Sequence, residues 1–322
     1  MNYAHLSGHA GHKIGLAKTD FSCYYQLHSI AMEYLMRFST PLRYPGGKGK
    51  LTDFLKLMFV QNDLLKGHYV EPYAGGAGIA LNLLLHNYVT CIHLNDLNPF
   101  VYTFWRIVLD DPDGLCRLIN DTDVTIDEWH KQKAIFKNPA NSSPLEIAFS
   151  MFFLNRTNRS GIILGGVIGG KKQDGDWKLN ARFNKVDLIS RIEKIALHSS
   201  NIRLYNLDAA KLVTEILPTL PDKTLVYLDP PYYVKGKGLY QNHYLHDDHI
   251  AIAKLVKTEI KLPWIVSYDH APEIVKMYDG CPTIEYGINY SAQERYKGAE
   301  VMFFSKNLLI PDVKNPSNLQ IA

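Results

Sequence analysis

The chain between residues about 40 and 115 alternates short apolar runs with longer helical patterns. Tyr69–Pro72 and Thr90–Asn95 predict two strands, bounded by polar or glycine-rich segments. Ala77–His86 and Pro99–Leu109 predict two helices, the second beginning with a proline, which suits a first helical turn. Strand, helix, strand and helix in succession are typical of a parallel sheet with right-handed crossovers.

The pattern changes between residues about 116 and 200. Ile126–Phe136 and Leu145–Leu154 predict amphipathic or buried helices, and Gly161–Lys185 after them is rich in glycine and basic residues. Strand and helix signals then resume in the order Leu225–Leu228, Asp248–Ile260, Trp264–Ser267, Thr283–Tyr290 and Glu300–Phe304.

These patterns predict the fold class and the domain organisation. We expect one α/β sheet domain, residues 40–115 and 201–310, with helices on both faces. An inserted helical and hairpin module, residues 116–200, interrupts it. Residues 1–39 have no clear periodicity, so we expect a flexible extension, or a segment upstream of a start at Met32 or Met36. Residues 311–322 are expected to form a tail.

Composition narrows the class of protein. The four cysteines include no CxxC pair, so their spacing predicts neither a disulfide framework nor a zinc site. His5, His9 and His12 are better explained by a flexible tail than by metal binding, and no metal is expected. No apolar stretch is long enough to span a bilayer and no leader is evident, which predicts a cytoplasmic protein.

Positive charge is concentrated in one segment. Nine Lys and Arg residues between Arg156 and Lys194 face four acidic residues, which gives +5 in a chain whose net charge is +3. Such an excess suits a polyanionic partner. Taken alone, it is better explained by a solvated face of the protein.

A glycine-rich turn, Glu71–Gly78, follows the first predicted strand and opens the first predicted helix. Glycines allow positive φ angles and close approach of a ligand to the backbone. Asp96 ends the next strand, 18 residues after Gly78, where an acid can accept hydrogen bonds from a ribose. The turn does not match GxGxxG, so a dinucleotide is not the first choice of ligand.

A second turn, Arg43–Lys48, precedes the first strand. Its Pro-Gly-Gly sequence followed by Lys48 can bring an amine and an aromatic ring to one ligand. On its own it is better explained as a turn that starts a helix.

The apolar run Val226–Leu228 ends in the sequence Asp229-Pro230-Pro231-Tyr232. At the carboxyl end of a parallel strand, this loop faces the crevice where open α/β sheets bind ligands. The prolines have no N–H, so their carbonyls and the Asp229 carboxylate form a rigid, purely accepting surface. Such a surface fits an exocyclic amine, and Tyr232 offers a ring on which a base could stack.

These motifs together resemble the DNA adenine N6-methyltransferases of the Dam type, the D12 class. The resemblance covers residues about 40–306 and rests on Tyr44–Lys48, Glu71–Gly78, Asp96, Asn155–Gly161 and Asp229–Tyr232, in that order. It implies a Rossmann-like methyltransferase sheet with an inserted DNA-recognition module. It also implies transfer of a methyl group from S-adenosylmethionine to adenine N6 in double-stranded DNA, by a monomer that can accompany a restriction endonuclease.

The resemblance implies roles for individual residues. Asp229 and the Pro230 carbonyl would accept from the target amine, and Tyr232 would stack on the flipped base. Asp96 would take the ribose hydroxyls of the cofactor, and Asp208 its adenine. The other residues implied to line the cofactor are Tyr44, Lys48, Tyr73, Ala74, Gly75, Gly76 and Gly78, and Asp229 is implied to border it as well.

The same resemblance places DNA contacts in the basic segment. The implied residues are Asn155, Arg156, Asn158, Arg159, Ser160, Gly161, Lys171, Lys172 and Arg182. The apolar, glycine-rich sequence after Gly161 departs from the more polar hairpin of other members, so the recognised DNA sequence stays open. Alternatives are an amino-methyltransferase acting on cytosine N4 or RNA, and a catalytically silent DNA-binding protein.

A group of histidines near residue 246 could also be interpreted as a metal site. His243, His246 and His249 lie beside Asp247 and Asp248, but an aspartate capping the following helix explains the acids more simply. We expect surface or DNA-side packing for the histidines. Ser267–Asp269 resembles the late family motif that lines the target pocket, and Glu300 is expected to be a structural acid.

Overall fold

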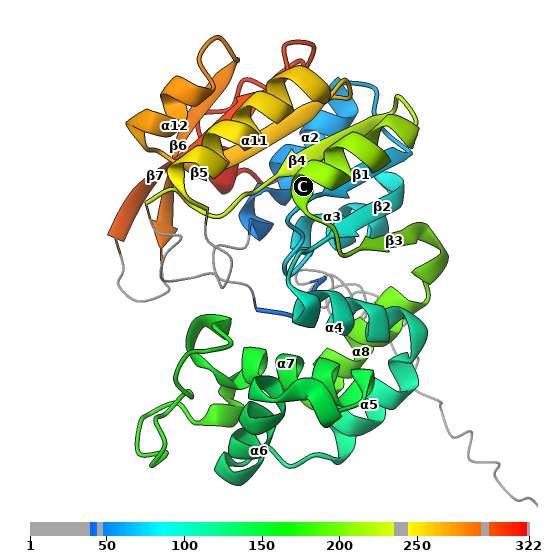
Figure 1. Ribbon diagram of the computed structural model, residues 1–322, viewed down its shortest axis with the longest axis vertical. Helices are drawn as coiled ribbons and strands as arrows, with labels where there is room; N and C mark the ends of the chain where they lie inside the picture. Colours follow the sequence, from blue (N-terminus) through cyan, green and yellow to red (C-terminus); the bar gives the residue numbers. More distant parts are fainter. Residues whose placement is uncertain (1–38, 44–47, 235–243, 291–295, 321–322) are drawn as a thin grey trace, which may run out of the picture. The chain divides into compact units, whose positions relative to one another are not determined.

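The sheet is built from strands whose residues are almost entirely buried. All residues of β4 (Thr224–Leu228) and β5 (Trp264–Asp269) are buried, as expected for parallel strands covered on both faces. The computed structural model describes residues 39–43, 48–234, 244–290 and 296–320 (Figure 1). All of them belong to one compact unit, residues 38–322.

Seven strands form one sheet in the order β3-β2-β1-β4-β5-β7-β6. The remaining strands are β1 (Gly67–Glu71), β2 (Val89–Asn95), β3 (Ile202–Tyr205), β6 (Thr283–Tyr290) and β7 (Tyr296–Phe304). The first five in spatial order are parallel, and β7 runs antiparallel to both β5 and β6. This arrangement confirms the predicted α/β class and the closing strand pair.

Helices cover both faces of the sheet, each over its own apolar cluster. On one face α2 (Thr52–Gln61) and α3 (Gly78–Leu85) pack on the strands. On the other face lie α11 (His246–Glu259), α12 (Pro272–Met277) and the short segment that begins with α9 (Ala209–Lys211). Alternation of side chains along a strand divides the core in this way, with Tyr69 on the first face and Val70 on the second.

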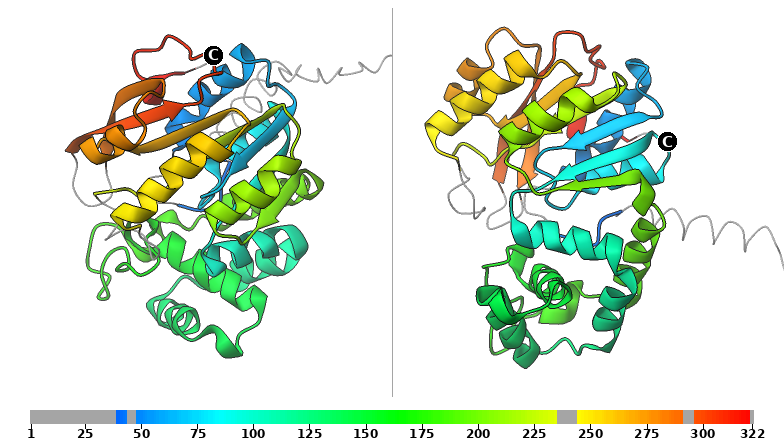
Figure 2. Two further views of the ribbon diagram at one scale, coloured as in Figure 1. Left: turned by 45° about the horizontal axis from the view of Figure 1, so that its top comes forward. Right: turned by 45° about the vertical axis from the view of Figure 1, so that its right-hand side comes forward.

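The chain between β2 and β3 is helical and forms a separate group in Figures 1 and 2. Its helices are α4 (Pro99–Asp110), α5 (Pro112–Asp121), α6 (Ile126–Lys137), α7 (Pro144–Thr157) and α8 (Lys185–Ala196). Ser143 and Glu146 form a capping box at the start of α7, with Pro144 in its first turn. The expected boundary at residue 116 falls inside α5, because Pro112 starts that helix directly after α4.

Two expectations about α11 need correction. The residue that caps its N-terminus is Leu245, not Asp247 or Asp248, and Asp248 accepts from the Leu245 N–H at 2.8 Å from within the first turn. His249 is not a surface residue: it is 1% exposed and lies 3.1 Å from the Tyr268 hydroxyl through Nδ1. His243 lies outside the described residues. Across the described part of the chain, no helix has both the length and the apolar character needed to cross a membrane.

Aromatic packing joins α7 to α4, the helix that directly follows β2. Phe152 on α7 has no exposed surface, stacks on Phe104 of α4 at 5.8 Å between centroids, and meets the edge of Phe183 at 5.6 Å. Phe152→Ala leaves a cavity between these rings, so we expect a loss of about 3–5 kcal/mol in the free energy of unfolding, measured by urea denaturation.

The control is Val186→Ala on α8, whose side chain is 80% exposed and should change that free energy by less than about 0.5 kcal/mol. A loss below about 1 kcal/mol for Phe152→Ala would contradict a close-packed junction.

Candidate active site

A cavity of about 820 Å³ lies at the carboxyl ends of β1, β2 and β4. Open α/β sheets bind ligands at this edge. The structure brings to it nine residues expected at the cofactor, from five separate parts of the chain. They are Lys48, Tyr73, Ala74, Gly75, Gly76, Gly78, Asp96, Asp208 and Asp229. Tyr44 lies outside the described residues.

The glycine-rich turn is folded tightly against the ends of β1 and β2. Gly75 has φ of 47° and Ala77 has φ of 49°, so the chain reverses before α3 begins at Gly78. The Ala74 N–H donates to the Asn95 carbonyl at 2.8 Å, and Trp105 Nε1 donates to the Gly75 carbonyl at 2.9 Å. These two hydrogen bonds fix the turn to β2 and α4, and the backbone of the turn borders the cavity.

Asp96 holds two backbone groups of the cavity wall. Its carboxylate accepts from the N–H groups of Gly75 and Asn98, both at 2.9 Å. Burial raises the pKa of Asp96 to about 6, against the opposing effect of those two hydrogen bonds. Asp208 also lines the cavity, and its side chain caps α9 by accepting from the Ala210 N–H.

Asn95 is a cavity residue that the sequence analysis missed. Its amide nitrogen donates to the carbonyls of Pro72 and Leu207, and its amide oxygen accepts from the Leu207 N–H, all within 3.0 Å. One buried side chain thus joins the ends of β1, β2 and β3. The available signal was a polar residue at the end of an apolar strand, where buried backbone groups need hydrogen-bond partners.

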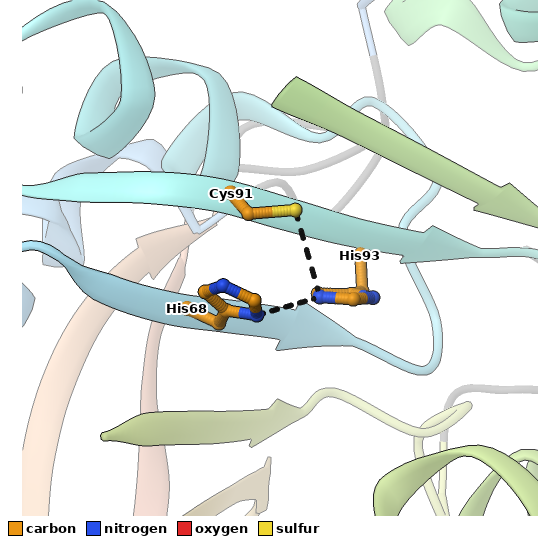
Figure 3. Close-up of side chains that lie close together, drawn as sticks. All are labelled: His68, Cys91 and His93. Atoms are coloured by element: carbon orange, nitrogen blue, oxygen red, sulfur yellow. Dashed lines mark hydrogen bonds between the residues drawn. The ribbon is translucent and has the colours of Figure 1, made fainter. Parts of the chain in front are cut away.

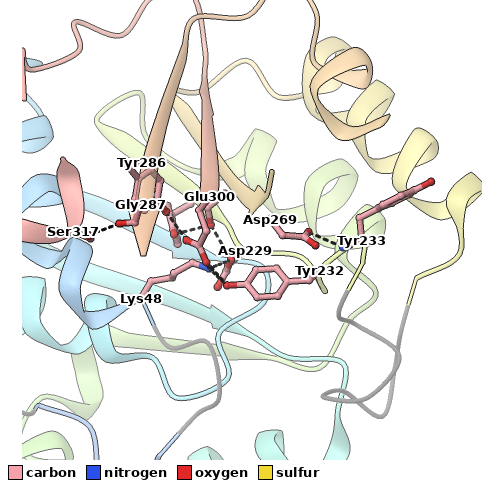
Figure 4. A network of polar contacts seen from close by, with 11 residues as sticks. Lys48, Asp229, Tyr232, Tyr233, Asp269, Tyr286, Gly287, Glu300 and Ser317 are labelled. Atoms are coloured by element: carbon pink, nitrogen blue, oxygen red, sulfur yellow. Dashed lines mark hydrogen bonds and ion pairs between the residues drawn. The ribbon is translucent and has the colours of Figure 1, made fainter. Parts of the chain in front are cut away.

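The opposite side of the cavity contains a buried network of charged and hydroxyl groups (Figure 4). Lys48 Nζ lies 2.9 Å from Asp229 Oδ1, and Ser267 Oγ donates to the same oxygen at 2.8 Å. Tyr227 in turn contacts Ser267 Oγ at 2.8 Å. Among the described residues, both polar partners of the Asp229 carboxylate therefore contact Oδ1.

Burial and charge oppose each other in this network. Burial alone would lower the pKa of Lys48, but Asp229 and Glu300 beside it raise that pKa well above its ordinary value. Burial raises the pKa of Asp229, while Lys48 and the hydrogen bonds to its carboxylate hold the rise down. For Glu71, also at the cavity, burial has the largest effect and raises the pKa to about 8.

Tyr232 belongs to the buried network. Its hydroxyl accepts from Lys48 Nζ at 2.8 Å and donates to Glu300 Oε1 at 2.5 Å, and its side chain is 3% exposed. The ammonium of Lys48 lies 4.7 Å from the ring centroid. Glu300 accepts further from the Tyr286 hydroxyl at 2.7 Å. Asp229 and Pro231 line the cavity itself, and Pro230 between them is buried.

The chain after the two prolines is held by a carboxylate that sequence reasoning had not given this role. Asp269, at the end of β5, accepts from the N–H groups of Tyr233 and Val234, each at 2.9 Å (Figure 4). Asp269 is 4% exposed, and each of its two carboxylate oxygens accepts one of these backbone N–H groups. The signal was an acid directly after a buried strand, next to the strand that carries Asp229.

The asparagines expected to contact DNA are buried structural residues in this conformation. Asn155 accepts from the Arg43 N–H at 2.8 Å and donates to the carbonyls of Arg43 and Gly161. Asn158 accepts from Trp129 Nε1 at 2.7 Å and donates to two carbonyls of the loop after Gly161. Both side chains are buried, and their amide groups hold the loop together. In this conformation they have no surface with which to contact DNA.

Gly161 and Ser160 shape the same loop. Gly161 has φ of 76°, and a Cβ there would lie 2.0 Å from the Arg43 carbonyl oxygen, so only glycine fits. Ser160 has φ of 55°. The exposed members of the expected DNA-binding set are Arg159, Lys171, Lys172 and Arg182. Trp177, which the sequence analysis missed, is 68% exposed, with the Arg182 guanidinium 5.8 Å from its ring.

Arginine side chains line the part of the cavity nearest the insert. Arg156 donates to the Arg182 carbonyl at 2.7 Å, and burial together with the charges of Arg43 and Arg191 lowers its pKa to about 9. Arg43, Arg156, Arg182 and Arg191 all border the cavity. The sequence analysis did not predict Arg43 or Arg191 at the cavity, although Arg43 begins the turn Arg43–Lys48.

Comparison with known proteins identifies one family. The model of the D12 class N6 adenine-specific DNA methyltransferases matches residues 44–295. Similar solved structures include a candidate RNA methyltransferase from Pyrococcus horikoshii, 11% identical, with a TM-score of 0.40 over 82% of this chain and 84% of that one. The rRNA methyltransferase aviRa from Streptomyces viridochromogenes is also 11% identical, with a TM-score of 0.39 over 81% and 86%. No curated protein matches the chain.

The buried position of Lys48 predicts a large effect on stability. Lys48→Ala leaves the fully buried Glu300 and the partly exposed Asp229 without their cation, so we expect a loss of about 3 kcal/mol in the free energy of unfolding, measured by urea denaturation at pH 7.

Lys223→Ala is the matched control, because Lys223 also lies 2.9 Å from a carboxylate, that of Asp63, but on the exposed surface. It should cost at most about 1 kcal/mol. Equal losses for the two variants would show that the Lys48 network is not effectively buried.

Proposed function

Because the chain belongs to the D12 class N6 adenine-specific DNA methyltransferase family and uses S-adenosylmethionine as its cofactor, we propose that it methylates adenine N6 in double-stranded DNA. The observation that carries this proposal is the position of Asp229. Its carboxylate lies at the same cavity as the glycine-rich turn, and two prolines follow it. An accepting group and a cofactor site on one cavity suit transfer of a methyl group to an amine.

The cavity fits the cofactor in size and in the chemistry of its wall. Its volume of about 820 Å³ lies within the roughly 300–1,000 Å³ of small-molecule sites. The backbone of Tyr73–Gly78 would border the cofactor, Asp96 would take the ribose hydroxyls, Asp208 the adenine, and Lys48 with Tyr44 the methionine part. When bound, S-adenosylmethionine supplies an electrophilic methyl group on a sulfonium sulfur.

Asp229 is the residue that acts on the target amine under this proposal. Lys48 and Ser267 both contact Oδ1, which leaves Oδ2 to accept a hydrogen of adenine N6. The Pro230 carbonyl takes the second hydrogen. Accepting both hydrogens withdraws the nitrogen lone pair from conjugation with the ring and stabilises charge that develops on nitrogen as it attacks. Tyr232 would stack on the base, which requires its ring to become accessible when DNA binds.

The helical insert would hold the DNA. A base inside a duplex must be flipped out to reach the cavity, at a cost of roughly a few kcal/mol. Arg159, Lys171, Lys172 and Arg182 belong to the insert and are exposed, and their contacts with phosphates would offset part of this cost. We propose that the enzyme acts as a monomer, alone or beside a restriction endonuclease that cuts the same sequence.

Asp229→Ala tests the chemistry. Incubation of the purified chain with labelled S-adenosylmethionine and unmethylated duplex DNA should yield N6-methyladenine on digestion. Asp229→Ala should reduce turnover by at least about 100-fold, because one of the groups that stabilises the developing charge is lost, while DNA affinity changes little. Asp222→Ala, in an exposed loop before β4, is the control and should keep full activity.

Label in N4-methylcytosine, or label only in RNA, would show that the enzyme acts on a different substrate. Absence of any label, with intact DNA binding, would indicate a silent DNA-binding protein. Loss of DNA affinity in Asp229→Ala would mean that the carboxylate is structural.

A second test concerns the insert. The double variant Lys171→Ala/Lys172→Ala should weaken DNA binding and reduce the slope of log affinity against log salt by about 1 to 2, because each lost phosphate contact removes roughly 0.9. Lys254→Ala/Lys261→Ala replaces two exposed lysines of the sheet domain and should leave both quantities unchanged. Fluorescence anisotropy at several salt concentrations measures them, and an equal effect of the two double variants would argue against the insert as the DNA-binding module.

A further inference from the structure

A cluster of one thiol and two imidazoles lies outside the cofactor cavity. His68 on β1 pairs in register with Cys91 on β2, and His93 follows two residues later on the same strand. Because successive side chains alternate across a strand, Cys91 and His93 point to the same face, and His68 joins them from the neighbouring strand. Figure 3 shows the three side chains directed toward one another.

The distances between their donor atoms suit one metal ion. His68 Nδ1 lies 3.1 Å and Cys91 Sγ 3.7 Å from His93 Nε2, and all three atoms lie within 4.8 Å of one another. A tetrahedral zinc ion with bonds of about 2.0–2.1 Å to nitrogen and 2.3 Å to sulfur separates its ligand atoms by roughly 3.3–3.6 Å. To reach that geometry the two nitrogens, now 3.1 Å apart, would separate by a few tenths of an ångström, and the sulfur would move closer to them.

Hydrogen bonding alone explains this cluster less well. The Cys91 thiol has only a long contact of 3.9 Å to the Ile92 carbonyl as an alternative to His93. His93 Nε2 faces both His68 Nδ1 and the Cys91 sulfur, yet a neutral imidazole nitrogen has either one lone pair or one hydrogen to offer. A cation between the three atoms satisfies all of them at once. Cys91 is 8% exposed and His93 3% exposed, while His68 is more accessible and gives an ion a route of entry.

Tyr205 on β3 supports the orientation that metal binding requires. Its hydroxyl lies 3.1 Å from His93 Nδ1, and the two rings are stacked 6.0 Å apart with an angle of 8° between their planes. With Nδ1–H donating to Tyr205, the lone pair of Nε2 is directed at His68 and Cys91. Histidine ligands usually carry such an outer partner on the second ring nitrogen.

We propose that His68, Cys91 and His93 bind a zinc ion, with water at the fourth position. Binding breaks the Cys91 S–H bond, forms a sulfur–zinc bond and releases the proton to solvent. The ion ties β1 to β2 just before Asn95 and Asp96, which hold the cavity wall, and is independent of the proposed methyl transfer. Cysteine spacing gave no sign of the site because its ligands come from two paired strands rather than from one CxxC turn.

Cobalt substitution tests the site in the full-length chain. After treatment with a chelator, the protein is titrated with Co²⁺ alone and then with Zn²⁺ as competitor. We expect about one equivalent of tetrahedral cobalt with a thiolate charge-transfer band in the near ultraviolet, and its displacement by Zn²⁺. Cys91→Ser should abolish the band, and His68→Ala should weaken cobalt binding at least tenfold while leaving the circular dichroism spectrum unchanged.

Two controls separate this site from other ligands in the chain. Cys116→Ser removes another buried free thiol and should keep the band. A variant with His5, His9 and His12 all changed to Gln should also keep it. The proposal is overturned if the wild-type chain binds no cobalt, if the band survives Cys91→Ser, if His68→Ala leaves cobalt affinity unchanged, or if the band disappears in either control. Because the readout is spectroscopic, the result does not depend on methyltransferase activity.

Discussion

The ammonium of Lys48, buried between two carboxylates, is the interaction on which the reactive end of the sheet depends. Lys48 comes from the turn before α2, Asp229 from the end of β4, and Glu300 from β7, so one charge joins three distant parts of the chain. The fully buried Glu300 beside the partly exposed Asp229 would be strongly destabilising without a cation. The same contact orients Asp229, because its Oδ1 is occupied by Lys48 and Ser267.

Two other carboxylates at the site, Asp96 and Asp269, hold backbone groups. Asp96 accepts from Gly75 and Asn98 on one side, and Asp269 accepts from Tyr233 and Val234 on the other. Both keep the loops at the strand ends in place, so the cavity wall and the chain after the prolines are preorganised. Asp229 differs because its polar partners are side chains on one oxygen. Asp96 and Asp269 therefore fix the loops on either side of Asp229, which is the carboxylate positioned to act on a substrate.

Hydrophobic periodicity was sufficient for most of the parallel sheet, because strands buried on both faces must be apolar throughout. It missed β3, whose four residues include the exposed Arg203, and it did not separate α8 from the basic segment around it. At the site, the motifs identified the residues that the cavity brings together. They did not show that Asn155 and Asn158 are buried, since an amide that binds DNA and one that holds a loop look alike in sequence.

The sequence by itself determined the α/β class, the order of the motifs and the chemistry that Asp229 and its prolines can offer, because these depend on local pattern and residue type. Only the tertiary structure decided which groups meet. Lys48 and Glu300 are 252 residues apart, and His68 and His93 belong to different strands, yet each pair is in contact. Strand register and the paths of the crossovers determine which distant residues come into contact. Both are set by packing of the whole core rather than by any one segment.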